Sequence, residues 1–194
     1  LSMEALKPMT ARDVRADTFP RGRFLLMDGR DIEACLKAAR LTRRWGGKVV
    51  VDIGSPRKRM DELFGLTDYF IASHAFVTRY FGRMSPETAC RRILAGGPGV
   101  VVITLGESGC IVATVDEFIK VPAFKRENFV VDTTGAGDVF HGAFIFGLTK
   151  GWSLERCARF ANATAFLKCG KLGGRAGIPT LGVVQEFLKH KGHP

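Results

Sequence analysis

The sequence predicts an α/β protein with a mostly parallel central sheet flanked by helices. Short apolar segments alternate with segments of helical period through the first hundred of its 194 residues, as they do in parallel α/β sheets. Residues 49–53 read Val-Val-Val-Asp-Ile, which is typical of a strand buried on both faces. No repeat, low-complexity stretch or linker interrupts the chain, so we expect a single domain over residues 1–194.

Turn and cap residues divide the chain into its expected elements. An irregular lead-in is expected over residues 1–23, where Pro8 and Pro20 interrupt any period. Asp31 is the expected cap of the first helix, which ends at Gly46. The expected strands span residues 24–27, 49–53, 69–72, 99–105, 110–115 and 118–121. The expected helices span residues 31–46, 85–96, 137–150, 153–170 and 180–190.

Composition excludes several classes of protein. Hydrophobic residues make up 46% of the chain and charged residues 25%, which is typical of a globular protein and excludes disordered, collagen-like and coiled-coil chains. No apolar run is long enough to span a membrane, so no membrane partner is expected. The five cysteines are scattered, odd in number and free of C-x-x-C spacing. They are therefore expected to be small core residues of a cytoplasmic protein.

The chain is basic, with 29 Lys and Arg residues against 19 Asp and Glu residues and a net charge of +10. Such a surplus attracts anions, including nucleic acid and phosphorylated small molecules. The basic residues fall in short clusters, for example Lys168, Lys171 and Arg175, without an interleaved aromatic ladder. This pattern favours a solvated basic surface and no nucleic-acid partner.

The most informative segment is residues 132–138, Asp-Thr-Thr-Gly-Ala-Gly-Asp, which joins an apolar run to an apolar helix. Small residues at such a junction leave backbone N–H groups uncovered at a helix N-terminus, a site suited to phosphate. Asp138, in the first turn, could accept a proton from an attacking hydroxyl. The alternative interpretation is a tight turn at Gly135 and Gly137, with Asp138 only favouring the helix dipole.

A second glycine turn, residues 104–109, follows the strongest predicted strand. Ligands of open α/β sheets bind at such strand ends, although an ordinary hairpin turn would look the same. Neither glycine turn ends in Gly-Lys-Ser/Thr, which disfavours a P-loop fold but not phosphate chemistry.

Residues 132–144 closely resemble the C-terminal signature of the PfkB, or ribokinase-like, carbohydrate kinases. The turn at 104–109 resembles that family's nucleotide-binding strand and loop, and 159–163 resembles the helix beside the adenine. Residues 168–180 resemble the loop and final helix that follow. The resemblance covers residues 24–188 and is greatest to ketohexokinase and fructokinase-like members. It implies a three-layer ribokinase-like fold.

The resemblance also implies roles for individual residues. Asp138 matches the catalytic base, and the backbone N–H groups of Gly135, Ala136 and Gly137 match the anion hole for the transferred phosphoryl group. For the nucleotide, the implied residues are Thr104, Gly106 and Gly109 at the phosphates and ribose, and Asn162 near the adenine.

Cations are implied as well. Asp132 and Thr134 match positions that hold a monovalent cation, K⁺, in many relatives, although some members do without it. Where many relatives carry Asn-x-x-Glu for Mg²⁺, this chain has Ser73-His74-Ala75-Phe76. Mg²⁺ is then expected to be organised by water and the nucleotide, and His74 is interpreted as a surface or loop residue.

The chain also lacks the family's Gly-Gly-Asn or Gly-Gly-Asp sugar motif in residues 1–60. We therefore expect a C-terminal, nucleotide-binding portion of a ribokinase-like domain, without the N-terminal strands and lid. An open sheet edge would invite self-association, such as a homodimer. The predicted function is that of an ATP-dependent carbohydrate kinase, which transfers the γ-phosphoryl group of MgATP to a sugar hydroxyl, with a ketohexose as the subgroup's indication. The alternative is a catalytically incomplete nucleotide-binding fragment.

Overall fold

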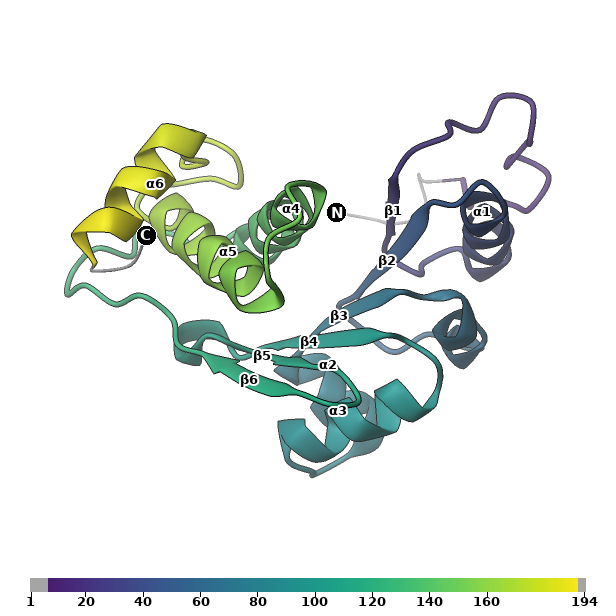
Figure 1. The fold of residues 1–194 in the computed structure, drawn as a ribbon, viewed down its shortest axis with the longest axis horizontal. Coiled ribbons are helices and arrows are strands. Elements are labelled where there is room, and N and C mark those ends of the chain that lie inside the picture. Colours follow the sequence, from purple (N-terminus) through teal and green to yellow (C-terminus); the bar gives the residue numbers. More distant parts are fainter. Residues whose placement is uncertain (1–6, 192–194) are drawn as a thin grey trace. The chain divides into compact units, whose positions relative to one another are not determined.

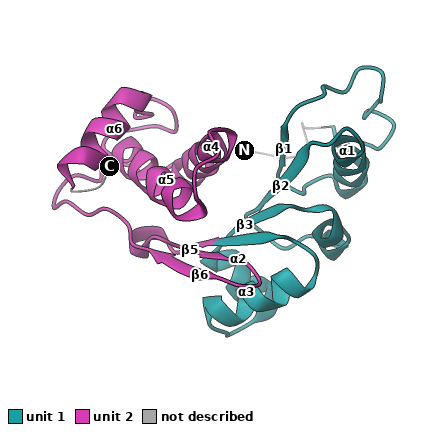
Figure 2. Cartoon of the chain, in the orientation of Figure 1, with its two compact units in different colours: residues 1–102 teal, residues 103–194 magenta. Residues whose placement is uncertain are grey.

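A computed structural model describes residues 7–191 (Figure 1), so the first six residues of the expected lead-in lie outside the described residues. Residues 7–23 form turns without a helix or strand. The chain folds as two compact units, residues 1–102 and residues 103–194 (Figure 2).

The first unit is built on parallel strands. β1 (Phe24–Met27) pairs with β2 (Lys48–Ile53), which in turn pairs with β3 (Tyr69–Ser73). α1 (Ile32–Arg44) packs against β1 and β2. Val49, Val50 and Val51 are completely buried, so the apolar run of β2 is covered on both faces as predicted.

Asp31 precedes α1 as predicted, but its side chain makes no capping hydrogen bond. Its backbone lies at φ −103° and ψ 83°, outside the extended conformation from which a cap side chain reaches the first turn. The position of the cap was therefore predicted correctly, whereas the expected bond is not formed.

Two short helical elements of this unit were not predicted. A 3-10 helix spans Met60–Leu66, and α2 spans His74–Phe81. The hydroxyl oxygen of Ser73 accepts a hydrogen bond from the Phe76 N–H at 3.1 Å and so caps α2. α3 (Pro86–Ala95) was predicted.

A single six-stranded sheet contains the strands in chain order, β1 to β6. β4 is Val100–Thr104, and β5 (Cys110–Ala113) forms an antiparallel pair with β6 (Phe118–Val121). The parallel pairs β1–β2 and β2–β3 confirm the predicted α/β class with a mostly parallel sheet.

Three helices complete the second unit: α4 (Ala136–Thr149), α5 (Leu154–Lys168) and α6 (Leu181–His190). α4 and α5 pack closely because Gly147 has no side chain, and a Cβ there would lie 2.7 Å from the sulfur of Cys157. α5 also packs against β5 and β6.

All five cysteines are buried and free, which confirms the expectation of small core residues. Burial raises the pKa of the Cys110 thiol to about 12, so the reactive thiolate is not populated at neutral pH. Among the described residues, no helix is both long and apolar enough to cross a membrane.

Candidate functional site

The loop before α4 forms the centre of the candidate site, and Gly135 gives it its shape. Gly135 is the N-cap of α4 and adopts a left-handed conformation with φ of 74°. A Cβ at this position would lie 3.0 Å from the carbonyl oxygen of Gly174. Both the positive φ and the close approach favour glycine, because any larger residue would be strained here.

Backbone N–H groups at this helix start differ in whether they already have an acceptor. Within residues 7–191, the N–H groups of Gly135, Gly137 and Asp138 make no backbone hydrogen bond. The Ala136 N–H differs, because it donates to the Thr133 carbonyl at 3.0 Å. The donors open to an anion are therefore those of Gly135, Gly137 and Asp138, reinforced by the positive end of the α4 dipole.

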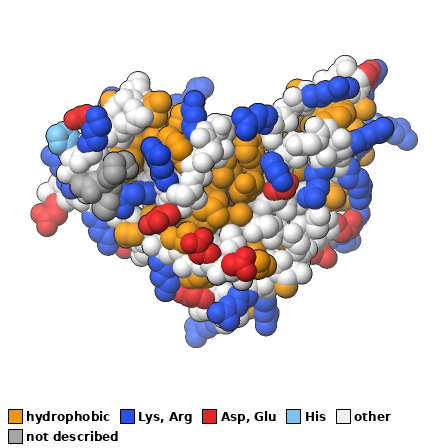
Figure 3. Space-filling model, in the orientation of Figure 1, with side chains coloured by type: hydrophobic (Ala, Val, Ile, Leu, Met, Phe, Trp, Pro, Cys, Tyr) orange, Lys and Arg blue, Asp and Glu red, His pale blue; other side chains and the backbone are white. Residues whose placement is uncertain are grey.

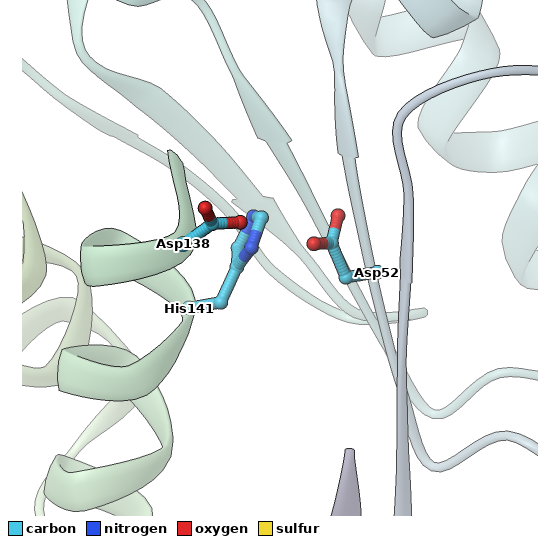
Figure 4. Close-up of side chains that lie close together, drawn as sticks. All are labelled: Asp52, Asp138 and His141. Atoms are coloured by element: carbon cyan, nitrogen blue, oxygen red, sulfur yellow. The ribbon is translucent and has the colours of Figure 1, made fainter. Parts of the chain in front are cut away.

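Asp138 and His141 extend from the first turns of α4 (Figure 4, which also draws Asp52 of β2). Asp138 is exposed, whereas His141 is buried, with 7% of its surface accessible. The sequence reading passed over His141, although its spacing of three residues from Asp138 places both on one helix face. A Cβ at Gly137 would lie 3.9 Å from Cε1 of His141, so the ring lies beside the first turn.

A pocket of about 570 Å³ opens beside this loop, entirely within the second unit. Thr134, Gly135 and Asp138 line its end at the helix start, and Arg175 adds one positive charge. The remaining lining is mostly apolar: Val139, Gly142, Ala143, Phe146, Phe160, Thr164, Gly174, Ile178, Pro179, Leu181 and Val184. An apolar pocket with a few polar groups at one end is the usual form of a small-molecule site.

Asp132 is tied firmly into the loop. Its carboxylate accepts the Thr134 N–H at 2.9 Å and the Gly173 N–H at 2.7 Å. The hydrogen bonds from Thr134 are the main cause that lowers the pKa of Asp132 to about 2, and the Gly173 N–H and nearby Lys168 act in the same direction. Asp132 therefore stays ionised at every physiological pH.

The residues predicted to contact nucleotide do not line this pocket. Gly106 and Gly109 form the turn between β4 and β5, with φ of 60° and 97°, and Thr104 ends β4. Asn162 is buried in α5, and its amide donates to the carbonyls of Val121 at 3.1 Å and Pro122 at 3.2 Å. In this structure the Asn162 side chain holds the end of β6.

The basic cluster near the end of α5 is not uniform. Lys171 and Arg175 are exposed as expected, whereas Lys168 is completely buried, which corrects the expectation of a solvated surface there. Its side chain reaches a backbone carbonyl, a contact that sequence does not reveal. Elsewhere Lys and Arg lie in separate small groups over the face in view (Figure 3), without a continuous basic stripe.

The segment expected at the magnesium position carries no carboxylate. His74 begins α2 and is exposed, in agreement with the surface interpretation. The Ser73 hydroxyl caps the helix. Since the segment has no carboxylate either, residues 73–76 offer no side chain typical of an Mg²⁺ ligand.

Comparison with known proteins identifies the family. Residues 6–181 match the pfkB family carbohydrate kinase domain. A ribokinase of Lactococcus lactis subsp. lactis is 34% identical over 157 residues, which are 81% of this chain and 50% of the relative. A nucleoside kinase of Methanothermobacter thermautotrophicus is 33% identical over 138 residues, which are 71% of this chain and 43% of the relative.

Solved structures agree with this match. The structure of Thermotoga maritima ribokinase superimposes with a TM-score of 0.78 and 29% identity, and the alignment covers 93% of this chain and 61% of that one. The chain thus spans about half the length of the curated relatives it matches. The protein belongs to the pfkB family of carbohydrate kinases.

Proposed function

We propose that the chain carries the nucleotide-phosphate site and the catalytic base of an ATP-dependent sugar kinase. One observation carries the proposal: Asp138 stands exposed in the first turn of α4, beside uncovered backbone N–H groups and at the end of a pocket. A proton acceptor and an anion site side by side are the two requirements of phosphoryl transfer to a hydroxyl.

The proposed step transfers the γ-phosphoryl group of ATP to the acceptor hydroxyl. The acceptor hydroxyl gives its proton to the Asp138 carboxylate while its oxygen forms a bond to the γ-phosphorus of ATP. The bond from that phosphorus to the bridging oxygen breaks, and ADP leaves with the electron pair. The N–H groups of Gly135 and Gly137 and the α4 dipole stabilise the negative charge on the transferred group. Ala136 would join them only if its N–H left the Thr133 carbonyl.

Thr104, Gly106 and Gly109 are proposed to border the nucleotide at the β4–β5 turn, and Asn162 to lie near the adenine. For Asn162 this role is indirect, because its amide is engaged with the end of β6. Magnesium is proposed to arrive with the nucleotide phosphates, since the described Ser73–Phe76 segment offers no carboxylate.

A monovalent cation such as K⁺ is proposed at Asp132 and Thr134. The Asp132 carboxylate has about four acceptor positions. The Thr134 and Gly173 N–H groups and the Thr134 side chain use three of them, which leaves one for a weakly bound cation. Exchange of KCl for choline chloride at constant ionic strength should then weaken ADP binding. Equal affinity in both salts would count against this ion.

The acceptor is proposed to be a sugar, with a ketohexose as one candidate. The experiment is mass spectrometry of a mixed pool of ketohexoses, aldoses, pentoses and nucleosides after incubation with MgATP and the chain. A product 80 Da heavier than one pool member, absent with Asp138→Asn, would support the kinase and name its acceptor. The exposed-turn variant Asp116→Asn is the matched control and should keep the product.

The second candidate is a nucleotide-binding fragment without turnover. The observation that favours it is length, because the chain spans about half of its relatives. ADP binding with no phosphorylated product from the folded chain would select this candidate over the kinase. If the folded chain does not bind ADP and forms no product, both candidates are rejected.

A further inference from the structure

Lys168, the last residue of α5, is completely buried. Lysine is almost never fully buried unless its ammonium group finds a partner, because an uncompensated buried charge is costly. The Nζ atom donates to the main-chain carbonyl oxygen of Asp132 at 2.9 Å. This bond connects the end of α5 to the loop that precedes α4.

The main chain of Asp132 is held from both sides by this part of α5. Its N–H, together with that of Val131, donates to the Cys169 carbonyl, at 3.1 Å and 2.8 Å respectively. Its carbonyl oxygen accepts from Lys168. The peptide groups on both sides of Asp132 are therefore fixed, and the direction of its side chain is fixed with them.

Close packing keeps Lys168 in place. A Cβ at Gly177 would lie only 2.1 Å from the Lys168 carbonyl oxygen, and one at Gly170 would lie 2.7 Å from the ring of Phe129. The segment after α5 thus passes directly over the end of that helix. This packing fixes the main chain of Lys168, from which the side chain extends to the Asp132 carbonyl.

The Asp132 carboxylate also constrains the loop before α4. One oxygen accepts the Thr134 N–H and the other accepts the Gly173 N–H. Thr134 is next to Gly135, which starts α4 and contributes to the anion site. A continuous series of contacts therefore runs from the buried ammonium group to the first N–H group that would meet a phosphate.

We infer that Lys168 is a positioning residue, whose buried ammonium group holds residues 133–138 in the conformation that binds phosphate. This inference rests on the proposed nucleotide site and assigns it a residue that touches neither nucleotide nor acceptor. An apolar side chain of similar length would fill the same volume but could not hold the Asp132 carbonyl.

The test compares Lys168→Met with the parent chain. Met keeps much of the stem and removes the ammonium group. Amide hydrogen exchange of Asp132, Thr134 and Ala136, the hydrogen-bonded amides of this segment, should become about tenfold faster or more, while that of β5 stays unchanged. Affinity for ADP should fall about tenfold, while affinity for adenosine, which has no phosphate, should stay the same. Lys189→Met, at an exposed position of α6, is the control and should match the parent in every measurement.

Each outcome is decisive. Unchanged exchange at Asp132, Thr134 and Ala136 would overturn the inference. Exchange that rises equally in β5 would show that Lys168 has only a general packing role. Equal losses of ADP and adenosine affinity would show the same, and either result would overturn the inference. If the parent chain itself binds no ADP, the proposed nucleotide site fails, whereas the exchange data still decide whether Lys168 holds the loop.

A second measurement covers the case in which Lys168→Met does not fold. In the parent chain, a buried and hydrogen-bonded ammonium group exchanges its protons slowly enough to give an NMR signal at neutral pH. That signal should be present for Lys168 and absent for the exposed Lys189. Its absence for Lys168 would contradict the bond to Asp132 and with it the inference.

Discussion

Two carboxylates lie six residues apart, Asp132 in the loop before α4 and Asp138 in the first turn of that helix, and the structure gives them different chemistry. Asp132 is held by two backbone N–H groups and is ionised with a pKa of about 2. Asp138 is exposed at the start of α4 and lines the pocket. A fixed, permanently ionised group suits a structural role, whereas an exposed group beside an anion site suits proton transfer.

The first residue-scale prediction concerns Asp138. Asp138→Asn should reduce phosphoryl transfer by about 10²–10⁴-fold, because a general base typically contributes that much to the rate. ADP affinity, measured by calorimetry, should stay within about twofold of the parent because the backbone donors remain. Parallel loss of both activity and ADP binding would contradict the role as a base.

The second residue-scale prediction concerns how the free energy of unfolding depends on pH. Asp132 has a native pKa of about 2 against an ordinary value of 3.8, so its ionised form is favoured by folding. A depressed carboxyl pKa contributes stability above the unfolded value, and that stability is lost as the pH falls from about 4 toward 2. Urea unfolding should therefore show Asp132→Asn less stable than the parent at pH 6, with a smaller difference at pH 3. A difference that does not shrink as the pH falls would contradict this assignment.

In the β4–β5 turn, two glycines of one motif are favoured for different structural reasons. Gly109 lies against the end of β6, where a Cβ would be 2.1 Å from the Val121 carbonyl oxygen. Gly106 also has a positive φ, of 60°, but no atom lies within 4 Å of its Cβ position. The packing of the turn requires one glycine, and backbone conformation alone favours the other.

Gly109→Ala should therefore destabilise the protein more than Gly106→Ala. The strain of a positive φ costs about 1–2 kcal/mol at either position, and overpacking adds about 1–3 kcal/mol at Gly109 alone. Urea unfolding measures both free energies. Equal losses of stability would show that the turn relaxes and that the close approach has no cost.

Sequence pattern predicted most elements because their signals are local. Pro86 and Gly135 mark helix starts, and the valine run at 49–51 marks a buried strand. α2 was missed because residues 73–76 were interpreted as a lost metal motif, whereas Ser73 is an N-cap. The burial of Lys168 could not be predicted, since it depends on a carbonyl 36 residues away in the chain.

For the whole molecule, membership of the family does not decide whether the chain turns over substrate. The match over residues 6–181 establishes the family, while the aligned part of the chain covers only about half of the curated relatives. The +10 net charge suits an anionic ligand and does not select one. Nucleotide binding is the property that the kinase and the fragment share.

The most direct test is an NMR titration of the ¹⁵N-labelled chain with MgADP. We expect saturable shifts of the Gly135, Gly137 and Asp138 amides, since their N–H groups would donate to the phosphates. Adenosine at the same concentration should leave these amides nearly unmoved. Shifts confined to other parts of the chain, with these three amides unchanged at saturation, would contradict the phosphate site and with it both proposed functions.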